Sequence, residues 1–301
     1  MLKKLRNTDT FAKNVIVVFI ASSLSNFLNL LFQLFIAHKL TASDFAAVNS
    51  LISLFMLIYA PLDTLRLTVI KHISEFRASG SLSKIRFLLS SLTRWIFFFA
   101  SALLVILLLN SAQMMEKLKI SSASLPYIFS LWIFLWFLIP IFSGGVQGME
   151  LFGWLSSYLV ISTIAKFFFA VIFIFMGYSI CGALGALLAS SLIGLAILYY
   201  PLKDFITFRS LKKEDVDFKQ IFTYLLPTAL GTFCFMALVN MDMVLVKYFY
   251  SAYDSGMYSL GQMVGKIFLF LPLAVTVVMF PKTSGLKAKQ ADTSVTFKRS
   301  L

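Results

Sequence analysis

Long apolar runs separated by short polar stretches dominate the hydropathy pattern of this chain. A helix needs about 20 apolar residues to cross the hydrocarbon core of a bilayer. The pattern predicts eight such helices, at residues 15–37, 45–65, 95–112, 125–145, 155–176, 181–200, 221–246 and 255–280. The first run is too long for a signal peptide, so we interpret it as a membrane anchor. The expected fold class is an all-α polytopic membrane protein with about eight transmembrane helices.

Composition supports this class and argues against several others. Of the 301 residues, 59% are hydrophobic and only 13% are charged, whereas soluble domains are about a quarter charged. The net charge is +13, but the basic residues lie mostly between apolar runs, so we expect no nucleic-acid partner. Cys181 and Cys234 lie inside apolar runs, and His38 and His72 are isolated. The sequence therefore predicts no metal site, no cofactor and no enzymatic activity.

Lys and Arg are distributed unevenly between the two sides of the predicted helices. Twenty of the 26 fall on the side of the N-terminal segment, and two lie inside spans. The opposite side has only four, Lys39, Lys117, Lys119 and Lys247. Because cytoplasmic loops carry the excess of positive charge, we expect both termini to be cytoplasmic. The expected division is a cytoplasmic segment 1–14, a six-helix lobe 15–200, a cytoplasmic linker 201–220, the first two helices of a second lobe 221–280, and a cytoplasmic tail 281–301.

Two stretches beside the spans have a less direct interpretation. Residues 66–94 mix apolar and basic side chains and are divided by Gly80. They predict either two amphipathic helices on the membrane surface or extensions of the neighbouring spans into the cytoplasm. Residues 142–148 hold one serine and three glycines, which we interpret as a tight, helix-breaking exit from the fourth span.

The first two and the last two predicted helices resemble each other. Each pair is joined by a short turn in which a hydroxyl residue precedes an aspartate by three positions, Thr41 with Asp44 and Ser251 with Asp254. This spacing is close to that of a capping box, so we interpret these four residues as structural caps. Both pairs run in the same direction, which indicates a parallel repeat of two transporter halves. Six helices would form one complete half, and the last two would begin a second.

Polar residues inside the spans are candidates for a binding site, because each needs a partner or water there. In the first span they recur at three and four residues and share one helix face, and a shorter version of the pattern recurs in the last span. Such a face lines either a wet cavity or a tight helix interface. The candidates for a substrate cavity are Asn26, Asn29, Gln33, Lys166, Gln262 and Lys266.

The two deep lysines, Lys166 and Lys266, leave two interpretations open. They either face an anionic substrate in water-filled space or pair with a buried acid. Acids near the spans are few, and Asp63 and Asp242 are the candidates. Arg66 follows Asp63 by three residues, so we expect a local salt bridge between them.

Several stretches carry a resemblance to one family. They are Phe35 to Phe45, Gly144 to Phe152, Tyr178 to Ala186, Asn240 to Lys247 with Gly256 to Ser259, and Phe280 to Lys282. With these, the chain resembles a polysaccharide flippase of the multidrug/oligosaccharidyl-lipid/polysaccharide exporter superfamily, which is MATE-like. The resemblance implies two six-helix lobes around a cavity that opens alternately to either side. It also implies a cytoplasmic (inner) membrane location.

The resemblance further implies transport of a lipid-linked oligosaccharide, on undecaprenyl diphosphate, for cell-surface polysaccharide biosynthesis. Lys166 and Lys266 would then hold the diphosphate. Implied partners are this saccharide, the lipid bilayer and other membrane proteins of polysaccharide assembly. Members of the family have more helices than the eight expected here, so we expect a C-terminally truncated chain. The alternatives are a drug or cation antiporter of the same superfamily and a truncated remnant that does not transport.

Overall fold

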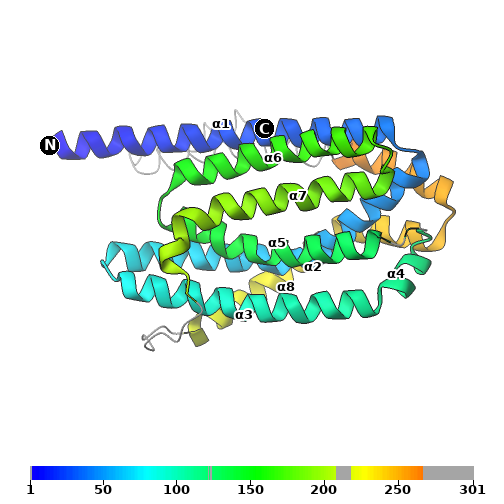
Figure 1. Ribbon diagram of the computed structural model, residues 1–301. Helices are drawn as coiled ribbons and strands as arrows, with labels where there is room; N and C mark the ends of the chain where they lie inside the picture. Colours follow the sequence, from blue (N-terminus) through cyan, green and yellow to red (C-terminus); the bar gives the residue numbers. More distant parts are fainter. Residues whose placement is uncertain (1, 121, 123, 208–217, 267–301) are drawn as a thin grey trace, which may run out of the picture.

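The computed structural model describes residues 2–120, 122, 124–207 and 218–266, and these residues contain helices but no strands. The helices run side by side along one direction (Figure 1). In chain order they are α1 (Leu2–Lys39), α2 (Ala42–Ala78), α3 (Leu82–Leu109), α4 (Ser111–Lys117), α5 (Leu125–Gly148), α6 (Phe152–Phe175), α7 (Ser179–Tyr199), the 3-10 helix η1 (Tyr200–Phe205) and α8 (Phe218–Phe249). Residues 252–266 form a further helix.

Seven helices in the described part are long and apolar enough to cross a membrane. They are Ile16–Lys39, Ala42–Ala78, Leu82–Leu109, Leu125–Gly148, Phe152–Phe175, Ser179–Phe205 and Leu226–Phe249. Seven of the eight predicted spans are thereby confirmed. The eighth, at 255–280, is helical through residue 266, and its remaining residues lie outside the described part. The predicted tail and half of the predicted linker also lie outside the described residues.

The stretch 66–94 extends the neighbouring spans, so the alternative of surface helices was wrong. α2 continues to Ala78, and α3 begins at Leu82. Gly80, at φ 72°, makes the turn between them, and Ser81 N–H donates to the Phe76 carbonyl over 2.8 Å. A residue in the left-handed conformation, with a hydrogen bond back to the last helical turn, is a common helix ending. Glycine adopts this conformation most easily because it has no Cβ.

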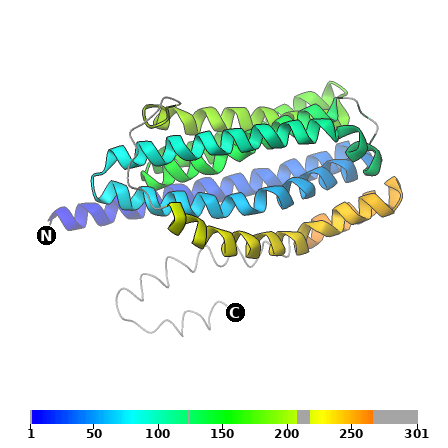
Figure 2. The same ribbon diagram turned by 90° about the horizontal axis from the view of Figure 1, so that it is seen from below.

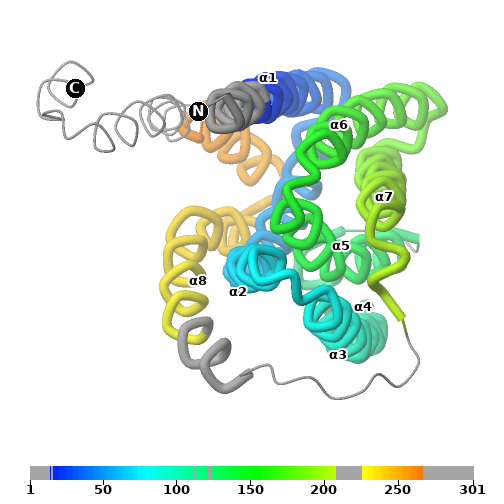
Figure 3. Tube along the Cα trace, turned by 90° about the vertical axis from the view of Figure 1, so that its left-hand side faces the viewer, coloured from blue at the N-terminus to red at the C-terminus, as the bar shows by residue number. Residues whose placement is uncertain are grey.

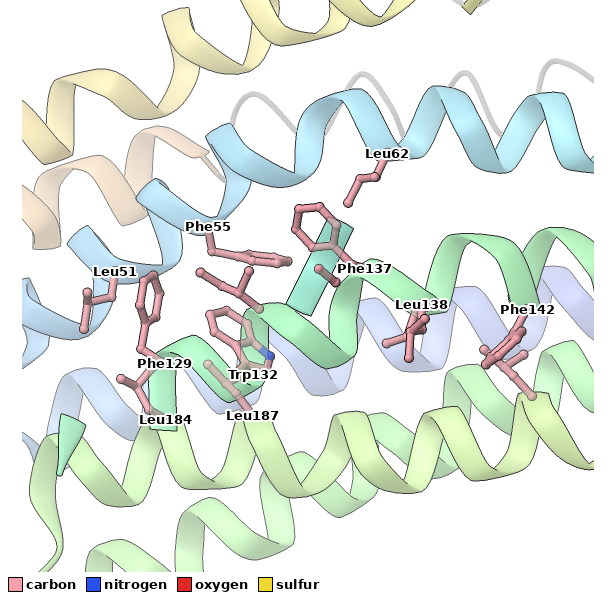
Figure 4. Packing of buried hydrophobic residues seen from close by; sticks show 14 of the residues in the cluster. Leu51, Phe55, Leu62, Phe129, Trp132, Phe137, Leu138, Phe142, Leu184 and Leu187 are labelled. Atoms are coloured by element: carbon pink, nitrogen blue, oxygen red, sulfur yellow. The ribbon is translucent and has the colours of Figure 1, made fainter. Parts of the chain in front are cut away.

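Two helices form the centre of the bundle. The apolar window of α5 is 72% buried and that of α2 is 61% buried, whereas those of α1, α3, α6 and α8 are each 17% buried. α5 packs against α2, α3 and α7, while α1 lies against α6 rather than beside α2 (Figure 3). Large side chains fill the α2–α5 interface, where the rings of Phe55 and Trp132 are 4.3 Å apart (Figure 4).

The glycines of residues 142–148 are packing residues, so their interpretation as a helix-breaking exit was wrong. α5 remains helical through Gly148. A Cβ on Gly144 would lie 2.9 Å from the Arg66 carbonyl oxygen, and one on Gly148 would lie 2.8 Å from the Ile73 Cβ. Close approach of backbones through small residues is how membrane helices gain contact. The helix is capped by Met149, and the chain turns away at Glu150, which has a φ of 57°.

The two short turns lie together at one end of the bundle, which we call the turn end (right-hand side of Figure 1). Residues 40–41 join α1 to α2, and residues 250–251 join α8 to the helix 252–266. A Cβ on Gly256 would lie 2.6 Å from the Ala42 carbonyl oxygen, so the two backbones touch. α8 then packs along α2 on one side of the bundle (Figure 2).

Hydroxyl side chains cap the two helices that leave the turn end. Thr41 Oγ1 accepts a hydrogen bond from Asp44 N–H over 3.1 Å. Ser251 Oγ accepts one from Asp254 N–H over 3.1 Å and donates one to Asp254 Oδ2 over 2.6 Å. Each hydroxyl thus satisfies a backbone donor that the first helical turn leaves free.

Candidate functional site

The first polar cluster joins α6 to α1 inside the membrane-spanning part. Lys166 Nζ donates a hydrogen bond to Asn29 Oδ1, and the ammonium lies 4.7 Å from the ring centre of Phe32. About one turn away, Ser25 Oγ donates to the Leu159 carbonyl over 2.7 Å, which keeps the two helices in register. No carboxylate among the described residues acts on Lys166.

Lys166 therefore has no carboxylate among the described residues to neutralise its ammonium group. The oxygen of an amide carries only a partial charge, so Asn29 orients the ammonium without neutralising it. The face of Phe32 adds a weak attraction for the cation. The interpretation that Lys166 pairs with a buried acid finds no support among the described residues.

The other predicted residues of α1 have separate environments. Gln33 Nε2 donates to Asn49 Oδ1 over 2.6 Å, and Asn49 Nδ2 donates to the Phe45 carbonyl over 3.0 Å. Gln33 thus links α1 to α2 near the turn end. Asn26, two turns earlier, is exposed. The stripe of three amides therefore faces three different surroundings, of which only Asn29 contacts a charged side chain.

The second polar cluster joins α8 to the helix 252–266. Asp242 accepts hydrogen bonds from the Tyr258 hydroxyl over 2.7 Å and from Gln262 Nε2 over 2.9 and 3.0 Å. Lys266 Nζ donates to Asn240 Oδ1 over 3.1 Å. Asp242 also acts on Lys266 electrostatically, so this cluster carries both a negative and a positive charge.

The second cluster lines an open pocket of about 490 Å³. Its walls are Val239, Asp242, Tyr258, Gly261, Gln262, Gly265 and Lys266. Gly261 and Gly265 lie one turn apart, and a Cβ on either would meet open space. Gln262 and Lys266 were predicted from the sequence, whereas Tyr258 was not, although the spacing of four residues between Tyr258 and Gln262 places both on one helix face.

Arg66 belongs to a third group of contacts, between α2 and α5. Its Nε lies 2.9 Å from Asp63 Oδ1, which confirms the predicted salt bridge, and its Nη1 donates to Gln147 Oε1 over 3.2 Å. Further along α2, Arg77 Nη1 lies 2.7 Å from Glu150 Oε2. The contacts of Arg66 with Gln147 and of Arg77 with Glu150 join α2 to the last turn of α5 and the residue that follows it, at the end of the bundle opposite the turn end.

Lys166 and Lys266 belong to different clusters, and no contact joins them in the described ranges. No group of three His, Cys, Asp or Glu side chains among these residues is placed to hold a metal ion. The arrangement provides two cationic groups, one acid and several amides at membrane depth. Such groups are suited to binding polar or charged molecules inside a bilayer.

The fold is that of an α-helical transporter superfamily. The chain is similar to a solved inward-facing multidrug resistance MATE family transporter of the MOP superfamily, with a TM-score of 0.64 and 12% identity, over 91% of this chain and 66% of that one. An outward-facing structure of such a transporter gives a TM-score of 0.61 and 14% identity, over 88% of this chain and 68% of that one. A MOP superfamily transporter from Pyrococcus furiosus Vc1 gives the same values.

These likenesses are too distant in sequence to define more than the fold, and the chain spans about two thirds of the length of the solved structures. The family model for polysaccharide biosynthesis proteins matches residues 11–287. The chain therefore belongs to the polysaccharide biosynthesis protein family. Comparison with curated proteins gave no match.

Proposed function

We propose that this protein moves a lipid-linked oligosaccharide, carried on a polyprenyl diphosphate such as undecaprenyl diphosphate, across the cytoplasmic membrane for cell-surface polysaccharide biosynthesis. The family membership supports the polysaccharide context. The single observation that carries the proposal is Lys166, whose ammonium lies at membrane depth, held by an amide and without a neutralising carboxylate among the described residues.

The charge of Lys166 explains why the cargo would be anionic. An ammonium in low dielectric attracts a phosphate more strongly than one in bulk water does. A diphosphate that reached Lys166 would replace a neutral partner, Asn29, with a charged one, and charge-assisted hydrogen bonds are about twice as strong as neutral ones. Lys266, whose partner Asn240 is also an amide, would act in the same way from the second cluster.

The membrane orientation belongs to the same proposal. The excess of basic residues on the side of the N-terminal segment supports cytoplasmic termini. The turn end would then face away from the cytoplasm. In this orientation residues 15–200 form the first lobe and residues 221–280 begin a second, with the cargo path between them.

A leaflet-translocation assay tests the proposal. The purified protein is reconstituted into liposomes that contain a fluorescent polyprenyl-diphosphate saccharide, and a membrane-impermeant quencher reports how much of it reaches the opposite leaflet. Loss of a charged hydrogen bond is worth about 2 kcal/mol, or about thirtyfold in rate. We expect losses of this order in Lys166→Ala and Lys266→Ala, and partial retention in Lys166→Arg.

Lys39→Ala is the matched control, because Lys39 is an exposed lysine at the end of α1. Its rate should equal that of the wild type. Wild-type rates in both Lys166→Ala and Lys266→Ala would remove these lysines from the mechanism. A reconstituted wild-type protein without any translocation of the diphosphate-linked sugar would refute the proposed cargo.

A second candidate function, export of a cationic drug, is favoured by one observation. Asp242, which is half-buried, presents a carboxylate to the open pocket of the second cluster, and an acid within a membrane-spanning segment suits a cationic ligand. This function predicts that cells expressing the protein export a cationic dye and that Asp242→Asn abolishes the export. Unchanged dye retention in expressing cells would exclude it.

A further inference from the structure

The turn end buries a lysine that the proposed cargo site does not use. Asn240, Met243 and Lys247 recur at three and four residues along α8, and all three are buried, with Lys247 only 1% exposed. They therefore share one face of α8, the helix that packs along α2. Lys247 lies two residues before the end of α8. The sequence pattern places it beside a loop, but in the fold it is enclosed by neighbouring elements.

The ammonium group of Lys247 has no hydrogen-bond partner among the described residues. The charges that act on it are those of Lys119, of the same sign, and Asp44, of the opposite sign. Lys119 comes from the segment after α4, and its own Nζ donates to the Tyr250 carbonyl over 2.6 Å. Asp44 lies in the first turn of α2. The three charges thus come from three elements that meet at the turn end.

Burial of the Lys247 ammonium disfavours the packing of these three elements against one another. An ammonium that loses its water without gaining hydrogen-bond partners is strongly unfavourable. Lys119 adds repulsion because its charge has the same sign as that of Lys247. Among the described residues, only Asp44 offsets this repulsion. Lys247 therefore disfavours the arrangement in which it is observed.

Close packing favours the same arrangement. Gly256 touches the backbone of Ala42, so that even a methyl group would not fit between them. Ser255 Oγ hydrogen-bonds the carbonyl of Val246 over 3.2 Å, which ties the helix 252–266 to α8. Contacts of this kind hold membrane helices together. Packing thus favours the observed arrangement of the turn end, which we call closed, and the buried charge of Lys247 disfavours it.

We propose that Lys247 is a conformational switch residue, which destabilises the closed turn end so that this end can open and the ammonium can reach water. The inference rests on the proposed function in one respect, because a transporter that releases cargo on two sides needs an end that both closes and opens. When two states differ little in free energy, a small differential interaction shifts their populations. Removal of the charge would leave the packing unopposed.

The test is a distance measurement across the turn end in the full chain, reconstituted in lipid nanodiscs without cargo. Spin labels are attached at Glu116→Cys and Tyr253→Cys, two exposed positions, in a background with Cys181→Ser and Cys234→Ser. Double electron–electron resonance then gives the ratio of closed to open populations. Lys247→Met removes the charge but keeps an unbranched apolar chain, and we expect this ratio to rise about tenfold or more.

Three further variants decide whether charge is the cause. Lys247→Gln is neutral as well and should raise the ratio, so the proposal does not depend on one variant. Lys247→Arg keeps the charge and should not raise it. Lys117→Met removes an exposed lysine at the same end and should leave the ratio unchanged. An unchanged or lower ratio in Lys247→Met and Lys247→Gln, or an equal rise in Lys247→Arg or Lys117→Met, would overturn the proposal. Because no cargo is involved, these results are independent of the translocation assay.

Discussion

Replacement of Gly148 by alanine tests how closely α5 approaches α2. The added Cβ would lie 2.8 Å from Ile73 Cβ, 3.0 Å from Ile73 Cγ2 and 3.1 Å from the Ile70 carbonyl oxygen. Carbon atoms in favourable contact are about 3.5–4.0 Å apart. The atoms that it meets belong to the backbone or lie next to it, so no flexible side chain can move aside. α2 must therefore shift away from α5 by about 0.7 Å to restore ordinary contact.

The cost of this shift follows from lost dispersion contacts. A gap of this size forfeits about a third of each contact energy of about 0.15 kcal/mol, and about 30 atom pairs at the crossing then lose about 1.5 kcal/mol in total. Alanine gains up to about 1 kcal/mol over glycine within a helix. We expect a net destabilisation of at least about 0.5 kcal/mol, which lowers the melting temperature by about 1 °C or more in a chain of this size.

Gly231→Ala is the matched control for this prediction. Gly231 lies within α8, and a Cβ there would meet nothing within 4 Å. This variant gains helix propensity without a clash, so its melting temperature should equal or exceed that of the wild type. The measurement is thermal unfolding of the purified variants in detergent, followed by loss of the monodisperse chromatographic peak. If Gly148→Ala is as stable as Gly231→Ala, the two helices do not depend on close contact at Gly148, and the estimate fails.

Three further predictions concern the polar contacts and the orientation. In a double-mutant cycle, Gln33→Met and Asn49→Leu should show a coupling of about 0.6 kcal/mol, as is typical of hydrogen bonds between membrane helices; additive losses of thermal stability would mean that no such bond forms. Thr41→Val removes the capping hydroxyl and should lower stability by about 1 kcal/mol, whereas Thr41→Ser should not. A membrane-impermeant maleimide added to intact cells should label Lys117→Cys but not Lys84→Cys, and the reverse pattern would invert the proposed orientation.

Most of the spans were predictable because their determinant is local. Hydrocarbon thickness requires about 20 apolar residues in a row whatever the neighbours are, so seven of the eight predicted spans appear in the described residues. The turns at Thr41 and Ser251 were recognisable for the same reason, since a cap involves residues only three positions apart. The extent of α2 and α3 was left open, because an amphipathic pattern beyond a span is compatible with either a surface helix or an extension.

The candidate site was predictable only in part. Lys166, Asn29, Gln262 and Lys266 stand out because polar residues at membrane depth are costly. Their partners did not follow from spacing, because a partner on another helix depends on how that helix is rotated and on which neighbour it meets. α1 packs on α6, and this brings Asn29 to Lys166. Tyr258 went unnoticed because its role depends on Asp242, on another helix.

The sequence by itself determined the membrane class, the spans and the helix caps, because these depend on hydrophobic length and on neighbours along the chain. Only the tertiary structure decided which side chains share an environment. It turned the glycines of residues 142–148 from an apparent helix end into the contact surface of α5. It also changed Lys247 from an apparent loop lysine into a buried charge without a hydrogen-bond partner in the described part of the chain. The physical reason is that packing and burial arise between helices. The spacing of residues within one helix does not specify which other helices it contacts.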